Sequence, residues 1–109
     1  MHEVMLVTGG AQRLGAAIVR QLHEAGHRIV VHCHRSLEAA TTLVAELNAA
    51  RADSAFALGA DLADPRALRD LVEQAAARWQ RLDGLVNNAA AFHSNTLAGT
   101  SPAIRAVAQ

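Results

Sequence analysis

Short apolar runs alternate with segments of helical periodicity through most of this chain of 109 residues. In the helical segments, apolar side chains recur at three- and four-residue steps, starting near Leu14, Ser36 and Pro65. The runs are rich in Val, Ile, Leu and Ala, which is typical of strands buried on both faces of a parallel sheet. They cover residues 4–7, 28–33, 54–62 and 85–87. This alternation predicts an α/β fold in which helices connect parallel strands.

Connections of this kind are right-handed crossovers, and they predict the strand order 3-2-1-4. The predicted architecture is the N-terminal half of a Rossmann-like, doubly wound parallel sheet. Helix ends are marked by Gly26 after the first helix and by Ser36, the expected N-cap of the second. The third helix is expected to begin after the cap residue Asp64, with Pro65 at its first position.

The C-terminal residues do not continue this pattern. Residues 93–109 lose periodicity and contain no strand-like run. We assign residues 1–92 to the half-domain and leave 93–109 as a tail, for which disorder is one interpretation. The outer edge of the fourth strand is then expected to be unpaired, and unpaired apolar edges favour self-association.

Polar and glycine-rich residues follow the ends of all four predicted strands, at 8–15, 34–36, 61–62 and 87–92. In doubly wound sheets the ligand lies beyond the carboxyl ends of the strands, at the point where the strand order reverses. That point lies between the first and fourth strands here. We therefore expect one binding site at this edge of the sheet.

The turn at 8–15, TGGAQRLG, has the position of a phosphate-binding turn. Glycines let the backbone approach a pyrophosphate, and the helix that follows directs free N–H groups at it. Gly9 and Gly15 fit this role, whereas Arg13 stands where a glycine is expected. A glycine-rich turn alone is not specific, because turns between strands and helices are commonly glycine-rich for backbone reasons.

The residues after the second strand bear on the choice of cofactor. A unit that prefers NAD places an acid about 20 residues after the glycine turn. Here that count reaches Arg35, and residues 25–37 contain no carboxylate. A guanidinium can bind a phosphate monoester through two hydrogen bonds, and Ser36 and His34 add a hydroxyl and a second cation. This trio favours NADPH/NADP, and a polar turn with a helix cap is the alternative.

In this order and spacing, TGGAQRLG, HCHRS, ADL and NNAAAF resemble the N-terminal half of a short-chain dehydrogenase/reductase, most closely a pteridine reductase. In pteridine reductases an arginine replaces the middle glycine of the turn, which explains Arg13. The resemblance implies NADPH binding by Gly9, Arg13, Leu14, Gly15, His34, Arg35, Ser36, Asp61, Leu62, Asn88 and Ala89.

Within that set the resemblance implies that Asp61 and Leu62 hold the adenine, and that Asn88 and Ala89 lie by the nicotinamide-side ribose. The pterin is expected to contact three residues: Arg13, Ala90 and Phe92, whose ring stacks on it. A homo-oligomer is expected for the full-length form.

The chain departs from the family pattern in two ways. Ala90 occupies a place where pteridine reductases commonly have a serine that bonds the pterin, so pterin specificity is less firmly implied. The chain also contains no Tyr and no Lys, which excludes the family's catalytic Tyr-x-x-x-Lys pair. No catalytic residue is assigned. With about 250 residues usual in the family, we expect a fragment that is inactive alone.

Composition excludes several other functions. Ten basic residues balance ten acidic ones, so no nucleic-acid or membrane partner is expected from net charge. Cys33 is the only cysteine, which favours a reducing, cytoplasmic location. His23 and His27, and likewise His32 and His34, have spacings that can bind a metal, but we predict no metal site.

Three functions remain open. The first is an NADPH-dependent reductase of dihydropterin or folate-type rings, represented by its cofactor-binding half. The second is a short-chain reductase of another carbonyl substrate, such as a 3-oxoacyl group or a sugar. The third is a truncated nucleotide-binding or dimerising module without catalysis.

Overall fold

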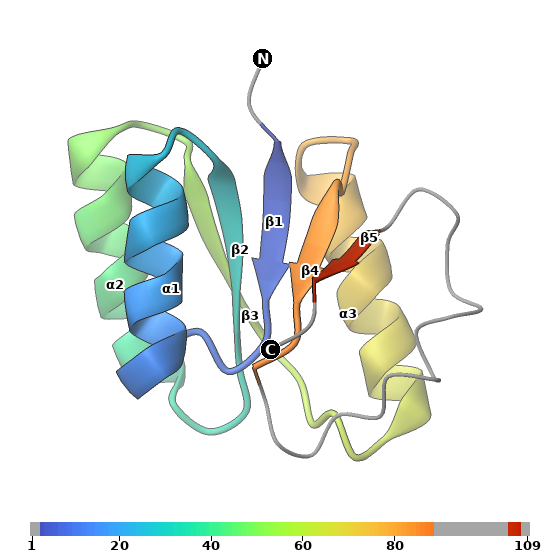
Figure 1. Cartoon of the computed structure of the whole chain (residues 1–109). Coiled ribbons are helices and arrows are strands. Elements are labelled where there is room, and N and C mark those ends of the chain that lie inside the picture. The colour runs from blue at the N-terminus through green and yellow to red at the C-terminus, as the bar shows by residue number, and fades with distance from the viewer. Residues whose placement is uncertain (1–2, 89–104, 108–109) are drawn as a thin grey trace.

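A computed structural model describes residues 3–88 and the backbone of residues 105–107. Its parallel sheet has the order β3-β2-β1-β4-β5 and lies between two helical layers (Figure 1). The strands are β1 (Val4–Val7), β2 (Arg28–Cys33), β3 (Ala55–Gly59), β4 (Gly84–Val86) and β5 (Arg105–Val107). The helices are α1 (Arg13–Glu24), α2 (Leu37–Ala50) and α3 (Pro65–Arg78). The predicted Rossmann-like order 3-2-1-4 is confirmed.

The core has two halves, one on each face of the sheet. Met5 and Val7 of β1 point toward α1 and α2, whereas Val4 and Leu6 point toward α3. All four residues of β1 are buried, as the continuous apolar run predicts for a central parallel strand. Figure 1 shows α1 and α2 together on one side and α3 on the other. No helix among the described residues has the length and apolar character needed to span a membrane.

Several predicted boundaries move by a few residues. β3 ends at Gly59 rather than continuing to Leu62, because the chain turns at Asp61 and Leu62 packs against α3. β4 is Gly84–Val86, one residue earlier than predicted. The Asp64 cap is confirmed, since its carboxylate accepts a bond from the backbone N–H of Arg66 at 2.9 Å.

The predicted cap of α2 is only half correct. Ser36 occupies the N-cap position, but its side chain makes no capping hydrogen bond. Its backbone, at φ −97° and ψ 44°, is not in the extended conformation that usually lets an N-cap side chain reach the next turn. The Ser36 hydroxyl is therefore not used by the helix.

The expectation of an unpaired outer edge on β4 is wrong. β5 (Arg105–Val107) pairs with β4 in parallel, with Leu85 opposite Ala106. This pairing satisfies backbone groups that a lone edge would leave without partners. Three residues are too few for periodicity to reveal a strand, so β5 could not be predicted from the sequence pattern.

Candidate functional site

Hydrogen bonds from two neighbouring strands fix the turn that follows β1. The Thr8 hydroxyl donates to the carbonyl oxygen of Val86 at 3.3 Å and accepts the backbone N–H of Asn88 at 2.9 Å. The Asn88 side-chain amide then donates to the carbonyl oxygen of Gly9 at 3.1 Å. The end of β4 thus holds the turn after β1 at the point where the strand order reverses.

From the other side, β2 holds the same turn through His32. The Gly9 backbone N–H donates to His32 Nδ1 at 2.9 Å, and the Gly10 N–H donates to the His32 carbonyl oxygen at 2.9 Å. Gly9 has a φ of 62°, a left-handed conformation that glycine adopts without penalty. The predicted role of Gly9 in the turn thus has a conformational basis.

Gly15 brings α1 close to the turn. A Cβ atom at Gly15 would lie 2.0 Å from the carbonyl oxygen of Gly9 and 2.8 Å from Nδ2 of Asn88. Neither distance is compatible with a side chain. The start of α1 can therefore contact the turn only because residue 15 is glycine.

Arg13, the first residue of α1, has a φ of 54°. This left-handed conformation costs a non-glycine residue about 1–2 kcal/mol, and it explains why glycine is usual at this position. The side chain is exposed at the helix N-terminus, and Leu14 beside it is 64% exposed. A strained backbone at an exposed, charged residue such as Arg13 is more typical of a binding site than of a residue with a purely structural role.

The N-terminus of α1 is an electropositive site. Its N-cap residue Gln12 makes no side-chain capping bond, and the first turn contains no acidic residue. The first backbone N–H groups of a helix have no partner within it and carry the positive end of the helix dipole. An anion above this helix would meet these N–H groups and the Arg13 guanidinium together.

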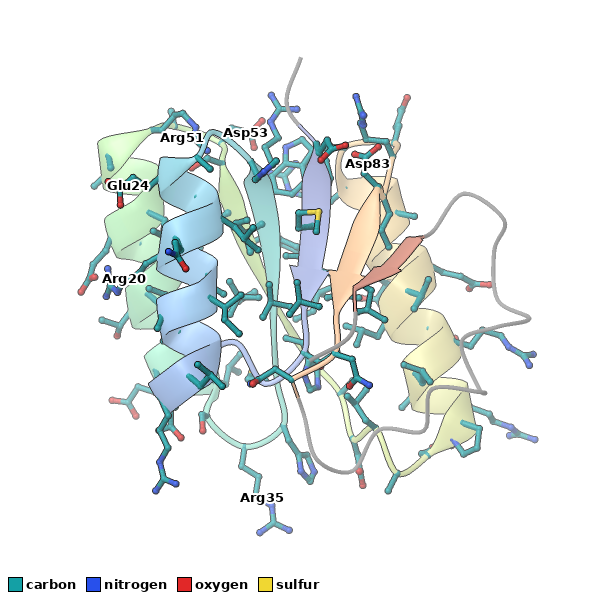
Figure 2. All side chains as sticks on the ribbon, viewed as in Figure 1. Arg20, Glu24, Arg35, Arg51, Asp53 and Asp83 are labelled. Carbon is teal, nitrogen blue, oxygen red and sulfur yellow. The ribbon has the colours of Figure 1, made fainter. Side chains whose placement is uncertain are left out.

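A pocket of about 290 Å³ joins the turn to the end of β2. The predicted trio His34, Arg35 and Ser36 lies along it, together with residues of the turn and of β2: Gly9, Ala11, Gln12 and Cys33. No carboxylate is among these lining residues. Figure 2 shows Arg35 extending from the loop after β2, away from the body of the protein.

The residues after β3 approach the same edge in different ways. Asp61 is exposed, and its Oδ2 lies 3.9 Å from Nε2 of His34, close enough for an ion pair when His34 is protonated. Leu62 is 7% exposed and packs in the core beneath α3, so its side chain is not accessible to a ligand. Ala89, Ala90 and Phe92 lie outside the described residues.

Sequence reasoning missed His32, Gln12 and Cys33 as part of this site. His32 and Cys33 belong to a run that indicated a buried strand, and His32 was otherwise considered only for its metal-binding spacing with His34. Burial raises the pKa of the Cys33 thiol. Among residues 3–88, no group of three or more His, Cys, Asp or Glu side chains is placed so that it could hold a metal ion.

Similarity to known proteins agrees with this geometry. A family profile described as short chain dehydrogenase matches residues 3–107. The chain belongs to the short-chain dehydrogenase family. Pteridine reductase 1 from Leishmania tarentolae is 40% identical, over 86% of this chain and 38% of that protein.

Two further relatives have other names. The 3-oxoacyl-(acyl-carrier-protein) reductase FabG from Staphylococcus aureus is 35% identical, over 89% of this chain and 39% of that protein. The short chain dehydrogenase/reductase dpmpG from Macrophomina phaseolina is 39% identical, over 78% of this chain and 48% of its own length. The chain therefore spans less than half the length of these relatives.

Proposed function

We propose that this chain is the dinucleotide-binding half of an NADPH-dependent pteridine reductase, which reduces dihydropterin or folate-type rings by hydride transfer. The observation that carries the proposal is the pocket at the end of β2. It presents Arg35, Ser36 and His34 beside the glycine turn, and none of its lining residues is a carboxylate. An NAD site would place an acid there for the ribose hydroxyls, whereas a 2′-phosphate needs cations and donors.

The residues present fit the dinucleotide. The uncapped start of α1 suits the pyrophosphate, because its N–H groups and the positive end of the helix meet no acidic side chain in the first turn. The Ser36 hydroxyl makes no capping bond, so it can donate to a phosphate oxygen. We assign the adenine to Asp61 and Leu62, the first of which lies 3.9 Å from His34.

Bound NADPH supplies the hydride. Arg13 contributes a cation where the pyrophosphate and an overlying pterin ring meet, and we assign it to both ligands. The 109 residues include no Tyr and no Lys, so a Tyr–Lys proton donor pair is not among them. In a cytoplasmic, homo-oligomeric full-length enzyme, this half would hold the cofactor while other residues protonate the substrate.

Similarity to FabG favours a second candidate, the reduction of a 3-oxoacyl substrate, because that relative is 35% identical over a similar share of this chain. Ala90 also lacks the hydroxyl that pteridine reductases commonly use on the pterin. Titrating a pterin against a full-length protein that contains this chain would separate the two candidates. Saturable binding supports the pterin, and its absence supports the carbonyl substrate.

The cofactor preference is tested by measuring NADPH and NADH affinities for this chain by isothermal titration calorimetry. NADPH should bind more tightly, and Arg35→Ala should reduce that preference roughly tenfold or more, because it removes a charge-assisted phosphate contact. Arg69→Ala is the matched control: it removes the same charge from an exposed position on α3 and should leave the preference unchanged. Equal affinities for both cofactors in the unaltered chain would refute the proposal.

A further inference from the structure

His32 is a buried histidine whose ring contacts two different parts of the site edge. It is 2% exposed, although it lies one residue from the end of β2. Its Nδ1 accepts the backbone N–H of Gly9 at 2.9 Å, and its Nε2 lies 2.8 Å from the carbonyl oxygen of Ala60, just after β3. The ring therefore joins the turn after β1 to the end of β3.

These two partners determine the state of the ring. A carbonyl oxygen can only accept, so Nε2 must carry a hydrogen, and an N–H group can only donate, so Nδ1 must be without one. Both contacts are satisfied together only by the neutral Nε2–H tautomer. A protonated ring would place an N–H of its own against the Gly9 N–H.

Displacement of Gly9 would not stay local. The carbonyl oxygen of Gly9 lies only 2.0 Å from the position that a Cβ atom of Gly15 would take, and it accepts the Asn88 amide at 3.1 Å. A shift of the Gly9 peptide therefore pushes on the first turn of α1 or breaks the bond to Asn88. The first turn of α1 carries the free N–H groups assigned to the pyrophosphate.

The surroundings of the ring favour its neutral state. Burial lowers the pKa of His32; the hydrogen bond to Ala60 opposes this, and the nearby charge of His34 adds to the lowering. The carboxylate of Asp61, which follows Ala60, lies 3.9 Å from Nε2 of His34. From the turn after β1, the group that contacts the His32 ring is the uncharged backbone N–H of Gly9.

We infer that His32 is a positioning residue for the dinucleotide: its neutral ring holds the glycine turn in the binding conformation, and protonation of the ring releases the turn. The inference rests on the proposed dinucleotide site. It predicts that dinucleotide binding depends on pH through the protonation of His32, a residue that does not itself contact the ligand. The effect is on the pyrophosphate side, so it applies equally to cofactors with and without a 2′-phosphate.

The state of the turn can be read in the free chain by nuclear magnetic resonance. Ring ¹⁵N shifts of His32 should report an unprotonated Nδ1 at about pH 8, and hydrogen exchange should show a protected Gly9 amide. As the pH is lowered and His32 becomes protonated, the protection of the Gly9 amide, corrected for the intrinsic pH dependence of exchange, should be lost over the same pH range. Protection of Gly9 that does not follow the charge of His32 would overturn the inference.

Binding is measured with NAD⁺, which has no 2′-phosphate to titrate in the same range. Its affinity for the unaltered chain should fall about three- to tenfold between about pH 8 and the pH at which the ring shifts show His32 to be protonated, the loss expected for one hydrogen bond. His32→Asn keeps an acceptor near Gly9 but cannot be protonated, so its affinity should change little with pH. A variant that follows the same pH profile as the unaltered chain would contradict the assigned role.

Two further variants test whether the pH dependence of NAD⁺ binding arises from His32 alone. His32→Leu should bind NAD⁺ weakly at both pH values, because it offers Gly9 no acceptor. His23→Asn replaces another buried histidine, which bonds Ser54 far from this edge, and should retain the pH dependence of binding. If neither NAD⁺ nor NADP⁺ binds at about pH 8, the proposed function fails, and the Gly9 amide still decides whether His32 controls the turn.

Discussion

Replacing Gly15 by alanine tests whether the close contact between α1 and the turn holds the site together. The added Cβ would lie 2.0 Å from the carbonyl oxygen of Gly9. That oxygen cannot swing away as a flexible side chain would, because its peptide unit is bonded at both ends: the Gly9 oxygen accepts the Asn88 amide, and the Gly10 N–H donates to the His32 carbonyl oxygen. The start of α1 has to move instead.

The size of the effect follows from three contributions. Overpacking costs about 1–3 kcal/mol, and losing the bond between Asn88 and Gly9 costs about 0.5–1.5 kcal/mol. The higher helix propensity of alanine returns up to about 1 kcal/mol. The net loss in the free energy of unfolding is about 2 kcal/mol, and dinucleotide binding should weaken with it.

Urea denaturation followed by circular dichroism measures this loss. With a slope of about 2 kcal/mol per molar urea, the midpoint should fall by about 1 M at unchanged slope. Gly59→Ala in β3 is the matched control, because its Cβ would meet only the Cys33 carbonyl oxygen at 3.9 Å, an ordinary contact. Equal midpoints for the two variants would refute the reasoning.

Two other variants test the strain at Arg13 and the buried His23. Arg13→Gly should raise the free energy of unfolding by up to about 1 kcal/mol, because relief of the left-handed φ of 54° exceeds the entropy cost of glycine; a lower urea midpoint would show that the arginine side chain makes stabilising contacts. Burial, and then the charge of Arg51, lower the pKa of His23 below its ordinary 6.5. The unfolded chain then binds more protons than the folded chain, so stability should fall as the pH drops below about 6.5. His23→Gln should show a smaller decrease between about pH 7.5 and about pH 5.5, and identical decreases in both proteins would rule out this role of His23.

The fold could be predicted because its strands carry strong local signals. β1 and β2 have their predicted bounds, since runs such as Arg28–Cys33 are apolar, rich in β-branched residues and bounded by turn residues. Asp64 before Pro65 located the start of α3 to the residue. β5, with three residues, had no such signal, and pairing with β4 rather than propensity defines it.

The sequence predicted where the site lies, at the carboxyl ends of the strands. It did not predict the hydrogen bonds that hold the site together. Periodicity identified His32 only as part of a buried strand, because nothing in its neighbours along the chain shows that its ring reaches Gly9. Asn88 was expected at the cofactor, yet its side-chain amide is bonded to the turn. Such contacts join residues far apart in the chain, and sequence patterns of a few residues contain no information about them.

The order in which the chain is synthesised affects the turn after β1. The contact between Gly9 and His32 spans 23 residues, but the bonds that Asn88 makes to Thr8 and Gly9 span 80 and 79. Closing such a long loop is slow compared with forming the helices, whose bonds are local. On the ribosome, the helices and the β1–β2 pair can therefore assemble while the turn is held from one side only. The bonds that fix the turn from the β4 side can form only after Asn88 has left the exit tunnel, although every glycine of the turn was made among the first fifteen residues.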